Sequence, residues 1–216
     1  MINSTYDTDK ISYLELYQPF FREFQFSEFT LLEIGVLKGG SLTLWHSLFP
    51  KAQIVGVDIA LPTNFPKTKR ITLRQGSQID LPFLDKVALE CAPNGFDFII
   101  DDASHYGEYT KCSFWHLFEN HLNPGGIYAI EDWGTGYWDD WPDGKSLDRS
   151  LYNSKIEVSK NPMPNHSYGM VGFVKQLIDE QGAADISKGN GASIPQQSKF
   201  KSITVTPYVV FITKAN

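Results

Sequence analysis

The sequence predicts an α/β fold with a doubly wound, mostly parallel sheet of seven strands that ends in an antiparallel hairpin. Short apolar runs rich in β-branched residues alternate with segments of helical periodicity, a pattern typical of right-handed βαβ units. The last two runs, at 202–206 and 208–213, are joined only by Pro207, and so short a connection requires antiparallel strands. A chain of 216 residues is long enough for one domain with a full hydrophobic core.

The individual elements follow from local composition. Residues 10–24 carry aromatic and aliphatic side chains at helical spacing, and we expect an amphipathic helix that is broken near Pro19. The other expected strands lie at 30–34, 53–58, 70–73, 96–101 and 127–131. The other expected helices lie at 39–49, 82–90, 109–121 and from 169 to about 179. The residues Asn-Pro-Gly-Gly at 123–126 are expected to form a turn before the fifth strand.

Residues 133–166 interrupt this alternation, because they show no period over more than thirty positions. A long irregular loop inside a compact domain commonly serves as a lid or binding loop, and we expect that role here; the alternative is a disordered surface insertion. The side chains expected to contact a substrate are Trp133, Tyr137, Trp138 and His166. The acidic side chains of the loop that are expected to be solvated are Asp139, Asp140 and Asp143.

Charge and composition exclude several classes of function. The net charge of −6 disfavours nucleic acid as the main partner, because phosphate binding needs a basic face. The sequence has no apolar run of about 18 residues, so no membrane span is expected, and its polar start lacks the core of a signal peptide. Cys91 and Cys112 form no disulfide framework or metal-binding pair, so we expect reduced thiols in a cytoplasmic protein.

Two acidic clusters each close a predicted strand. Asp101, Asp102 and His105 follow the run at 96–100, and Glu131 and Asp132 follow the run at 126–130. If these strands are parallel neighbours, the clusters share one edge of the sheet, where like charges raise each other's pKa unless a cation lies between them. We therefore expect Asp102, Glu131 and Asp132 to bind Mg²⁺ or another hard divalent cation, with His105 as a general base.

Simpler roles for these residues remain open. An acid pair at the end of a strand is often a helix cap, and Asp101 and Asp102 could cap the helix expected to start near Gly107. His105 could be an ordinary surface residue. The other histidines of the expected helices have no acidic neighbour at ligand spacing, and we interpret them as structural; they are His46, His116 and His121.

A second set of residues predicts a nucleotide-like ligand. The first strand ends in Glu33 and Gly35, and Gly39 and Ser41 open the next helix, so the backbone can turn sharply and approach a ligand. This spacing differs from the Gly-x-Gly-x-x-Gly pattern that seats a diphosphate, and an acid beside the glycine suits an ammonium group. Asp58 closes the second strand, where doubly wound folds bind ribose hydroxyls.

An adenosine ligand with an amino-acid tail is S-adenosylmethionine, and Ser77 and Gln78 after the third strand could border its adenine. The simpler alternative for Gly35 and Gly39 is that they are turn glycines, and for Asp58 that it is a turn residue at a strand end. A nicotinamide cofactor is disfavoured by the glycine spacing.

The sequence resembles a known family in four segments: LLEIGVLKGGSLTLW at 31–45, IIDDASH at 99–105, LNPGGIYAIEDW at 122–133 and SITVTPYVVFITK at 202–214. YDTDK and GMVGFVKQLID add to the likeness. The family is that of the class I, Mg²⁺- and S-adenosylmethionine-dependent O-methyltransferases that act on macrolide sugars, the macrocin and mycinamicin enzymes, with cephalosporin-hydroxylase-like proteins as relatives. The resemblance implies a Rossmann-like methyltransferase fold.

The resemblance also implies roles for single residues. It assigns Mg²⁺ to Asp102, Glu131 and Asp132 and the general base to His105. It places the following residues along the S-adenosylmethionine pocket: Glu33, Gly35, Asp58, Ser77 and Gln78. Asp101 is expected to face the methionine end of the cofactor.

These observations together predict one methyltransferase domain over 1–216, with an N-terminal helical segment at 1–29 and the lid at 133–166. The expected reaction moves a methyl group from S-adenosylmethionine to a hydroxyl of a sugar or another secondary metabolite. Two alternatives stay open: a cephalosporin-hydroxylase-like tailoring protein and a non-catalytic binding protein of the same fold. A homo-oligomer is also possible, because the aromatic N-terminal helix could either cover the sheet or form a subunit contact.

Overall fold

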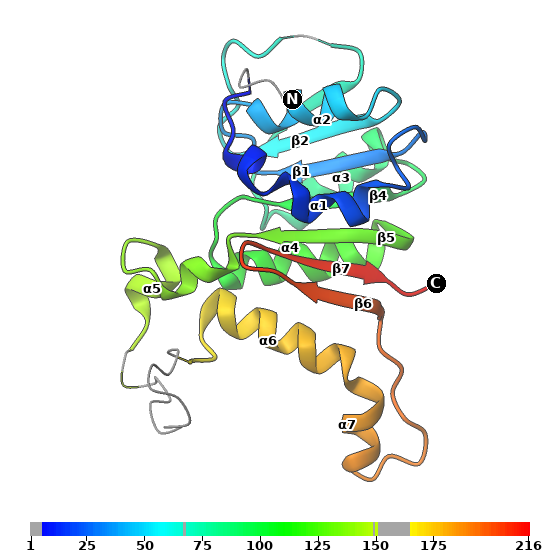
Figure 1. The fold of residues 1–216 in the computed structure, drawn as a ribbon, viewed down its shortest axis with the longest axis vertical. Coiled ribbons are helices and arrows are strands. Elements are labelled where there is room, and N and C mark those ends of the chain that lie inside the picture. Colours follow the sequence, from blue (N-terminus) through cyan, green and yellow to red (C-terminus); the bar gives the residue numbers. More distant parts are fainter. Residues whose placement is uncertain (1–5, 67, 149, 151–164) are drawn as a thin grey trace.

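A computed structural model describes residues 6–66, 68–148, 150 and 165–216 (Figure 1). Its seven strands form one sheet in the order β3-β2-β1-β4-β5-β7-β6. The strands are β1 (Thr30–Ile34), β2 (Gln53–Asp58), β3 (Ile71–Gln75), β4 (Phe96–Asp101), β5 (Leu122–Glu131), β6 (Phe200–Val205) and β7 (Val209–Lys214). β1 to β5 pair in parallel, and β7 pairs antiparallel with both β5 and β6. The predicted fold class is therefore confirmed, with the hairpin at one edge of the sheet.

Helices cover both faces of this sheet (Figure 1). The helices are η1 (Asp9–Tyr13), α1 (Leu14–Phe21), α2 (Gly40–Leu48), α3 (Leu81–Cys91), α4 (Gly107–Asn120), η2 (Trp133–Tyr137), α5 (Pro142–Ser146), α6 (Gly169–Gln181) and α7 (Ala183–Gly189). One core lies under α3, α4 and α6 and includes Phe114 and Phe173. The other lies under η1, α1 and α2 and includes Tyr17 and Trp45. Burial of these apolar side chains holds the helices on the sheet.

The N-terminal segment differs from expectation at Pro19. The chain forms η1 and then α1, and Pro19 lies inside α1 rather than at a break. Proline removes the hydrogen bond to the carbonyl of Glu15, but both residues lie on the exposed face, where water can bond that carbonyl. Tyr17 and Phe21 are buried against the sheet, so the aromatic helix covers the sheet.

Two further differences concern turns and loops. Residues 123–126, expected as a turn, lie within β5, whose pairing with β4 shifts register between Phe96 and Phe98. This irregularity lets the strand begin at Leu122 while Gly125 takes a φ of 73°. In the predicted lid, 133–146 forms η2 and α5 rather than an irregular loop, while 151–164 lies outside the described residues. α7 was not predicted.

Two expectations from composition can be compared directly with the structure. No helix within the described ranges is both long enough and apolar enough to cross a membrane. Cys91 and Cys112 are free thiols, as expected.

Candidate active site

The carboxyl ends of β1, β4 and β5 meet at one edge of the sheet. Ile34 of β1 lies in register with Asp101 of β4, which lies in register with Ile130 of β5. Three residues other than glycine have a positive φ within the described part of the chain, and each lies just beyond one of these strands: Leu37, His105 and Asp132. Backbone strain of this kind concentrates at functional sites, where the surrounding structure enforces it.

Asp102, His105 and Asp132 converge at this edge, as predicted. Each offers one ligand atom, and these atoms lie within 4.8 Å of one another. His105 Nε2 is 3.7 Å from Asp102 Oδ1 and 3.9 Å from Asp132 Oδ2. Burial and the charge of Glu131 raise the pKa of Asp132 to about 6. The carboxylate oxygens and their mutual repulsion fit a hard divalent cation such as Mg²⁺.

His105 is suited to accept a proton. Its side chain is buried, and burial lowers the pKa of its imidazole although the Glu131 charge opposes this shift. The ring is therefore neutral near pH 7 and has a free lone pair. Trp141 packs edge-on against it, with 4.8 Å between ring centroids. The sequence analysis noted Trp141 in the aromatic loop but did not assign it to the site.

A lysine that sequence reasoning missed lies among the carboxylates. Lys10 is 1% exposed, and its Nζ lies 2.5 Å from Asp102 Oδ2, 2.9 Å from Glu131 Oε2 and 3.6 Å from Glu33 Oε1. Burial opposes its charge, but the three carboxylates raise the pKa of Lys10, so the ammonium form persists. The only signal in the sequence was the YDTDK segment, which was used for the family resemblance and not for the site.

Glu131 has partners that the strand-end pattern did not predict. Its Oε2 accepts hydrogen bonds from Lys10 Nζ and from Tyr13 Oη at 2.6 Å, and its Oε1 accepts one from Tyr17 Oη. The carboxylate is fully buried and does not belong to the converging group of Asp102, His105 and Asp132. The assignment of Glu131 as a metal ligand thus stays a prediction.

The glycine loop after β1 depends on Gly35. Gly35 has a φ of 95°, and a Cβ there would lie 2.0 Å from the carbonyl oxygen of Asp102, so only glycine lets the β1 and β4 ends pass so closely. Glu33 is buried beneath it, and Oε2 accepts a 2.7 Å hydrogen bond from Trp45 Nε1. Glu33 Oε1 has no hydrogen-bond partner among the described residues, which suits an ammonium group.

Asp58 braces this loop from β2. Its Oδ2 accepts hydrogen bonds from the backbone N–H groups of Val36 at 2.7 Å and Leu37 at 3.0 Å, and its Oδ1 accepts one from Ala60 at 2.9 Å. Gly39, with a φ of 82°, begins α2, and a Cβ there would meet the ring of Phe65. Asp58 therefore shapes the place where a ligand would bind.

The remaining predicted cofactor residues lie deeper. Asp101 accepts hydrogen bonds from Ser113 Oγ at 3.0 Å and from Tyr128 Oη at 3.3 Å, and Gln78 Nε2 lies 3.4 Å away. Burial raises the pKa of Asp101 to about 6, although these hydrogen bonds pull it down. Ser77 Oγ accepts a weak bond from the backbone of Ile79. Ser41 is buried in the first turn of α2.

The predicted substrate residues point in different directions. Trp133 Nε1 donates to the carbonyl of Thr206 at 2.9 Å, which anchors that indole on the hairpin. Tyr137 and His166 form a ring pair with 4.4 Å between centroids. Trp138 is 56% exposed and is free of the core. All four contacts with a substrate remain predictions.

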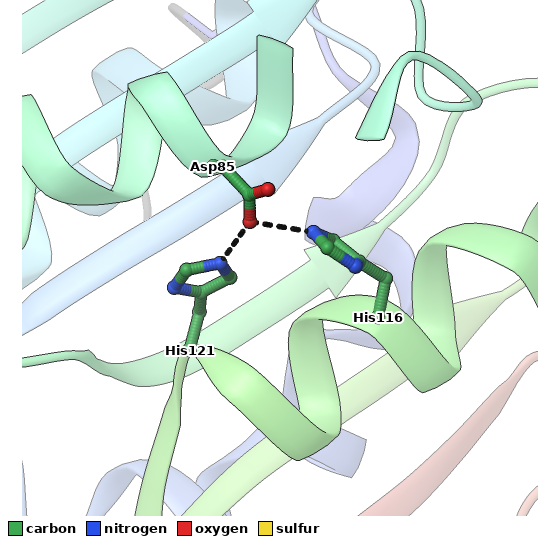
Figure 2. Close-up of side chains that lie close together, drawn as sticks. All are labelled: Asp85, His116 and His121. Carbon is green, nitrogen blue, oxygen red and sulfur yellow. Dashed lines mark hydrogen bonds and ion pairs between the residues drawn. The ribbon is translucent and has the colours of Figure 1, made fainter. Parts of the chain in front are cut away.

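Two expectations about polar side chains are wrong. Asp143, expected as solvated, is buried, and its Oδ2 accepts the backbone N–H groups that begin α4 and α6, Gly107 at 2.8 Å and Met170 at 2.7 Å. His116 and His121, expected to lack acidic neighbours, both contact Asp85 of α3 (Figure 2). Sequence spacing could not reveal either contact, because the partners come from different elements.

Comparisons with known proteins complete this description. No family model matches the chain. It is 40% identical over 63% of its length to mycinamicin VI 2''-O-methyltransferase from Micromonospora griseorubida, and 32% identical over 89% to demethylmacrocin O-methyltransferase from Streptomyces fradiae. These matches cover 36% and 46% of the relatives, so the chain spans less than half of their length.

A solved structure gives the same picture. The MycE methyltransferase of the mycinamycin biosynthetic pathway, in complex with Mg and SAH, is 31% identical in sequence and superimposes with a TM-score of 0.70. The match covers 94% of this chain and 49% of that one.

Proposed function

Because the chain belongs to the class I, S-adenosylmethionine-dependent O-methyltransferases related to the macrocin and mycinamicin enzymes, we propose that it methylates a hydroxyl of a sugar or another secondary metabolite. The observation that carries the proposal is the convergence of Asp102, His105 and Asp132 at the carboxyl ends of β4 and β5. This cluster combines oxygen ligands with a neutral base, and the reaction needs both.

The proposed chemistry assigns a task to each residue. Asp102 and Asp132, with Glu131 beside them, hold Mg²⁺ or a similar cation. Such a cation supplies positive charge that makes a nearby acceptor hydroxyl more acidic. His105 Nε2 takes the hydroxyl proton, and the oxygen gains the methyl group as its bond to sulfur breaks. Trp141 and the buried surroundings of His105 exclude water.

The remaining residues hold the two substrates. The proposed S-adenosylmethionine contacts are Glu33, Gly35, Gly39, Ser41, Asp58, Ser77, Gln78 and Asp101. We place the acceptor under the aromatic segment that follows Asp132. A single methyltransferase domain over 1–216, a cytoplasmic location and a homo-oligomeric state remain further expectations.

Cofactor binding gives the first test. Asp58→Ala should bind S-adenosylhomocysteine at least about 10-fold more weakly than the natural chain, because it removes charge-assisted hydrogen bonds that shape the loop. Isothermal titration with S-adenosylmethionine and S-adenosylhomocysteine measures this. Asp97→Ala is the matched control, since Asp97 braces the backbone of Thr30 at the opposite edge of the sheet. A natural chain that binds neither compound would refute the methyltransferase proposal, and unchanged binding by Asp58→Ala would refute the role of Asp58.

Metal removal gives the second test. Excess EDTA should abolish methyl transfer, and Mg²⁺ should restore it. Asp102→Asn and Asp132→Asn should each need at least about 10-fold more Mg²⁺ for half-maximal activity, because each removes a charged ligand. Asp140→Asn, in an exposed position of the nearby segment, should need no more Mg²⁺ than the natural chain. Full activity in EDTA would contradict the metal role.

A further inference from the structure

Three side chains from different elements converge outside the candidate active site (Figure 2). Asp85 extends from α3, His116 from α4, and His121 from the residue that ends α4. Both Nε2 atoms approach the same oxygen, Asp85 Oδ1, at 2.8 Å from His116 and 2.6 Å from His121. The three donor atoms lie within 4.8 Å of one another, so two imidazole nitrogens and one carboxylate oxygen surround a common point.

The cluster is built into the fold and reachable from solvent. The side chains of His116 and His121 are only 16% and 15% exposed, so packing limits their rotamers, whereas Asp85 is 44% exposed. An ion could therefore enter past the carboxylate and keep water in an open position. Hydrogen bonds from His116 and His121 lower the pKa of Asp85, so it is ionised near pH 7.

The cluster lies far from the candidate active site. The carbonyl of His121 accepts the backbone N–H of Phe96 at 2.7 Å, which places His121 at the start of β4. His105 lies beyond the other end of β4, next to the start of α4. α4 has 14 residues and so separates the two clusters by about 20 Å.

We propose that Asp85, His116 and His121 form a site for a first-row transition metal of the zinc class. Imidazole nitrogen suits Zn²⁺, whereas Mg²⁺ prefers oxygen ligands alone. Three protein ligands with an open position satisfy tetrahedral Zn²⁺ when water fills the fourth place. The present hydrogen bonds need a proton on each Nε2, so metal binding replaces those protons and becomes weaker as pH falls.

The metal would act as a clasp. Asp85 belongs to α3, while His116 and His121 belong to the end of α4, so coordination would tie the two helices together and fix the entry to β5. Because the ion would bind the folded chain, saturation should raise the melting temperature by on the order of 5 °C. This inference does not depend on the proposed methyl transfer.

The test uses isothermal titration of Zn²⁺ into the metal-stripped full-length chain. His105→Asn serves as the background, because it removes the only nitrogen ligand of the active-site cluster. We expect one Zn²⁺ per chain with a dissociation constant on the order of 10 μM, weaker than a closed four-ligand site. A 100-fold excess of Mg²⁺ should not displace it. Failure of the background chain to bind Zn²⁺ would overturn the proposal.

Variants locate the ion. Combined His116→Ala and His121→Ala should weaken Zn²⁺ binding at least 100-fold, and Asp85→Asn, which keeps shape and hydrogen bonding, at least 10-fold. His46→Ala is the matched control, since His46 contacts Thr68 and no carboxylate within the described residues. Visible absorption of bound Co²⁺ should show low-symmetry coordination in the background chain and lose it in the double variant. Equal Zn²⁺ binding in the background and the double variant would overturn the assignment.

Discussion

Replacing His105 by asparagine is expected to slow methyl transfer by about 10²–10⁴-fold, the usual contribution of a general base. Its neutral imidazole lies 3.7 Å from Asp102 Oδ1, beside the carboxylates that would hold the acceptor's cation, and the proposed acceptor proton has no other basic nitrogen near it in the described site. Asparagine is chosen because it tolerates the φ of 49° at this position better than alanine.

The measurement is a single-turnover assay of methyl transfer to a panel of glycosylated acceptors, with titration of S-adenosylhomocysteine alongside. Cofactor affinity should stay within about twofold, because His105 contributes to the proton transfer and not to the proposed cofactor pocket. The loss of rate should shrink as pH rises, since hydroxide can then remove the proton. His46→Ala should behave as the natural chain. A rate for His105→Asn within twofold of the natural rate would show that another group is the base.

Replacing Lys10 by methionine is expected to lower the free energy of unfolding by about 3–5 kcal/mol, the usual result of leaving buried charges without a partner. Lys10 Nζ touches Asp102 and Glu131 and lies 3.6 Å from Glu33. Glu33 and Glu131 are fully buried, so they cannot gain water when the ammonium is removed. Methionine keeps the length and the apolar stem of the lysine.

Urea unfolding measures the effect. Lys38→Met is the matched control, because Lys38 pairs with Asp7 at the surface, with side chains 70% and 71% exposed, and should change stability by less than about 0.5 kcal/mol. Lys10→Met combined with Glu131→Gln removes one carboxylate charge together with the ammonium and should recover part of the loss. If Lys10→Met matched Lys38→Met, the buried ion cluster would not be important for stability.

The two predictions rest on residues that the sequence exposes unequally. β1, β2 and β4 begin and end where their apolar runs do, because strands buried on both faces are continuous in sequence. β5 starts earlier than predicted, since pairing with β4 overrides the turn propensity of 123–126. Pro19 remains inside α1 because its missing hydrogen bond faces solvent.

The sequence by itself determined the sheet and the meeting of Asp102, His105 and Asp132. Residues that directly follow neighbouring parallel strands must share an edge, so local patterns were sufficient. Only the tertiary structure placed Lys10 beside Glu131 and Asp85 beside His116 and His121. These contacts join elements far apart in the chain, and no spacing encodes them, because the packing of helices against the sheet decides which side chains meet.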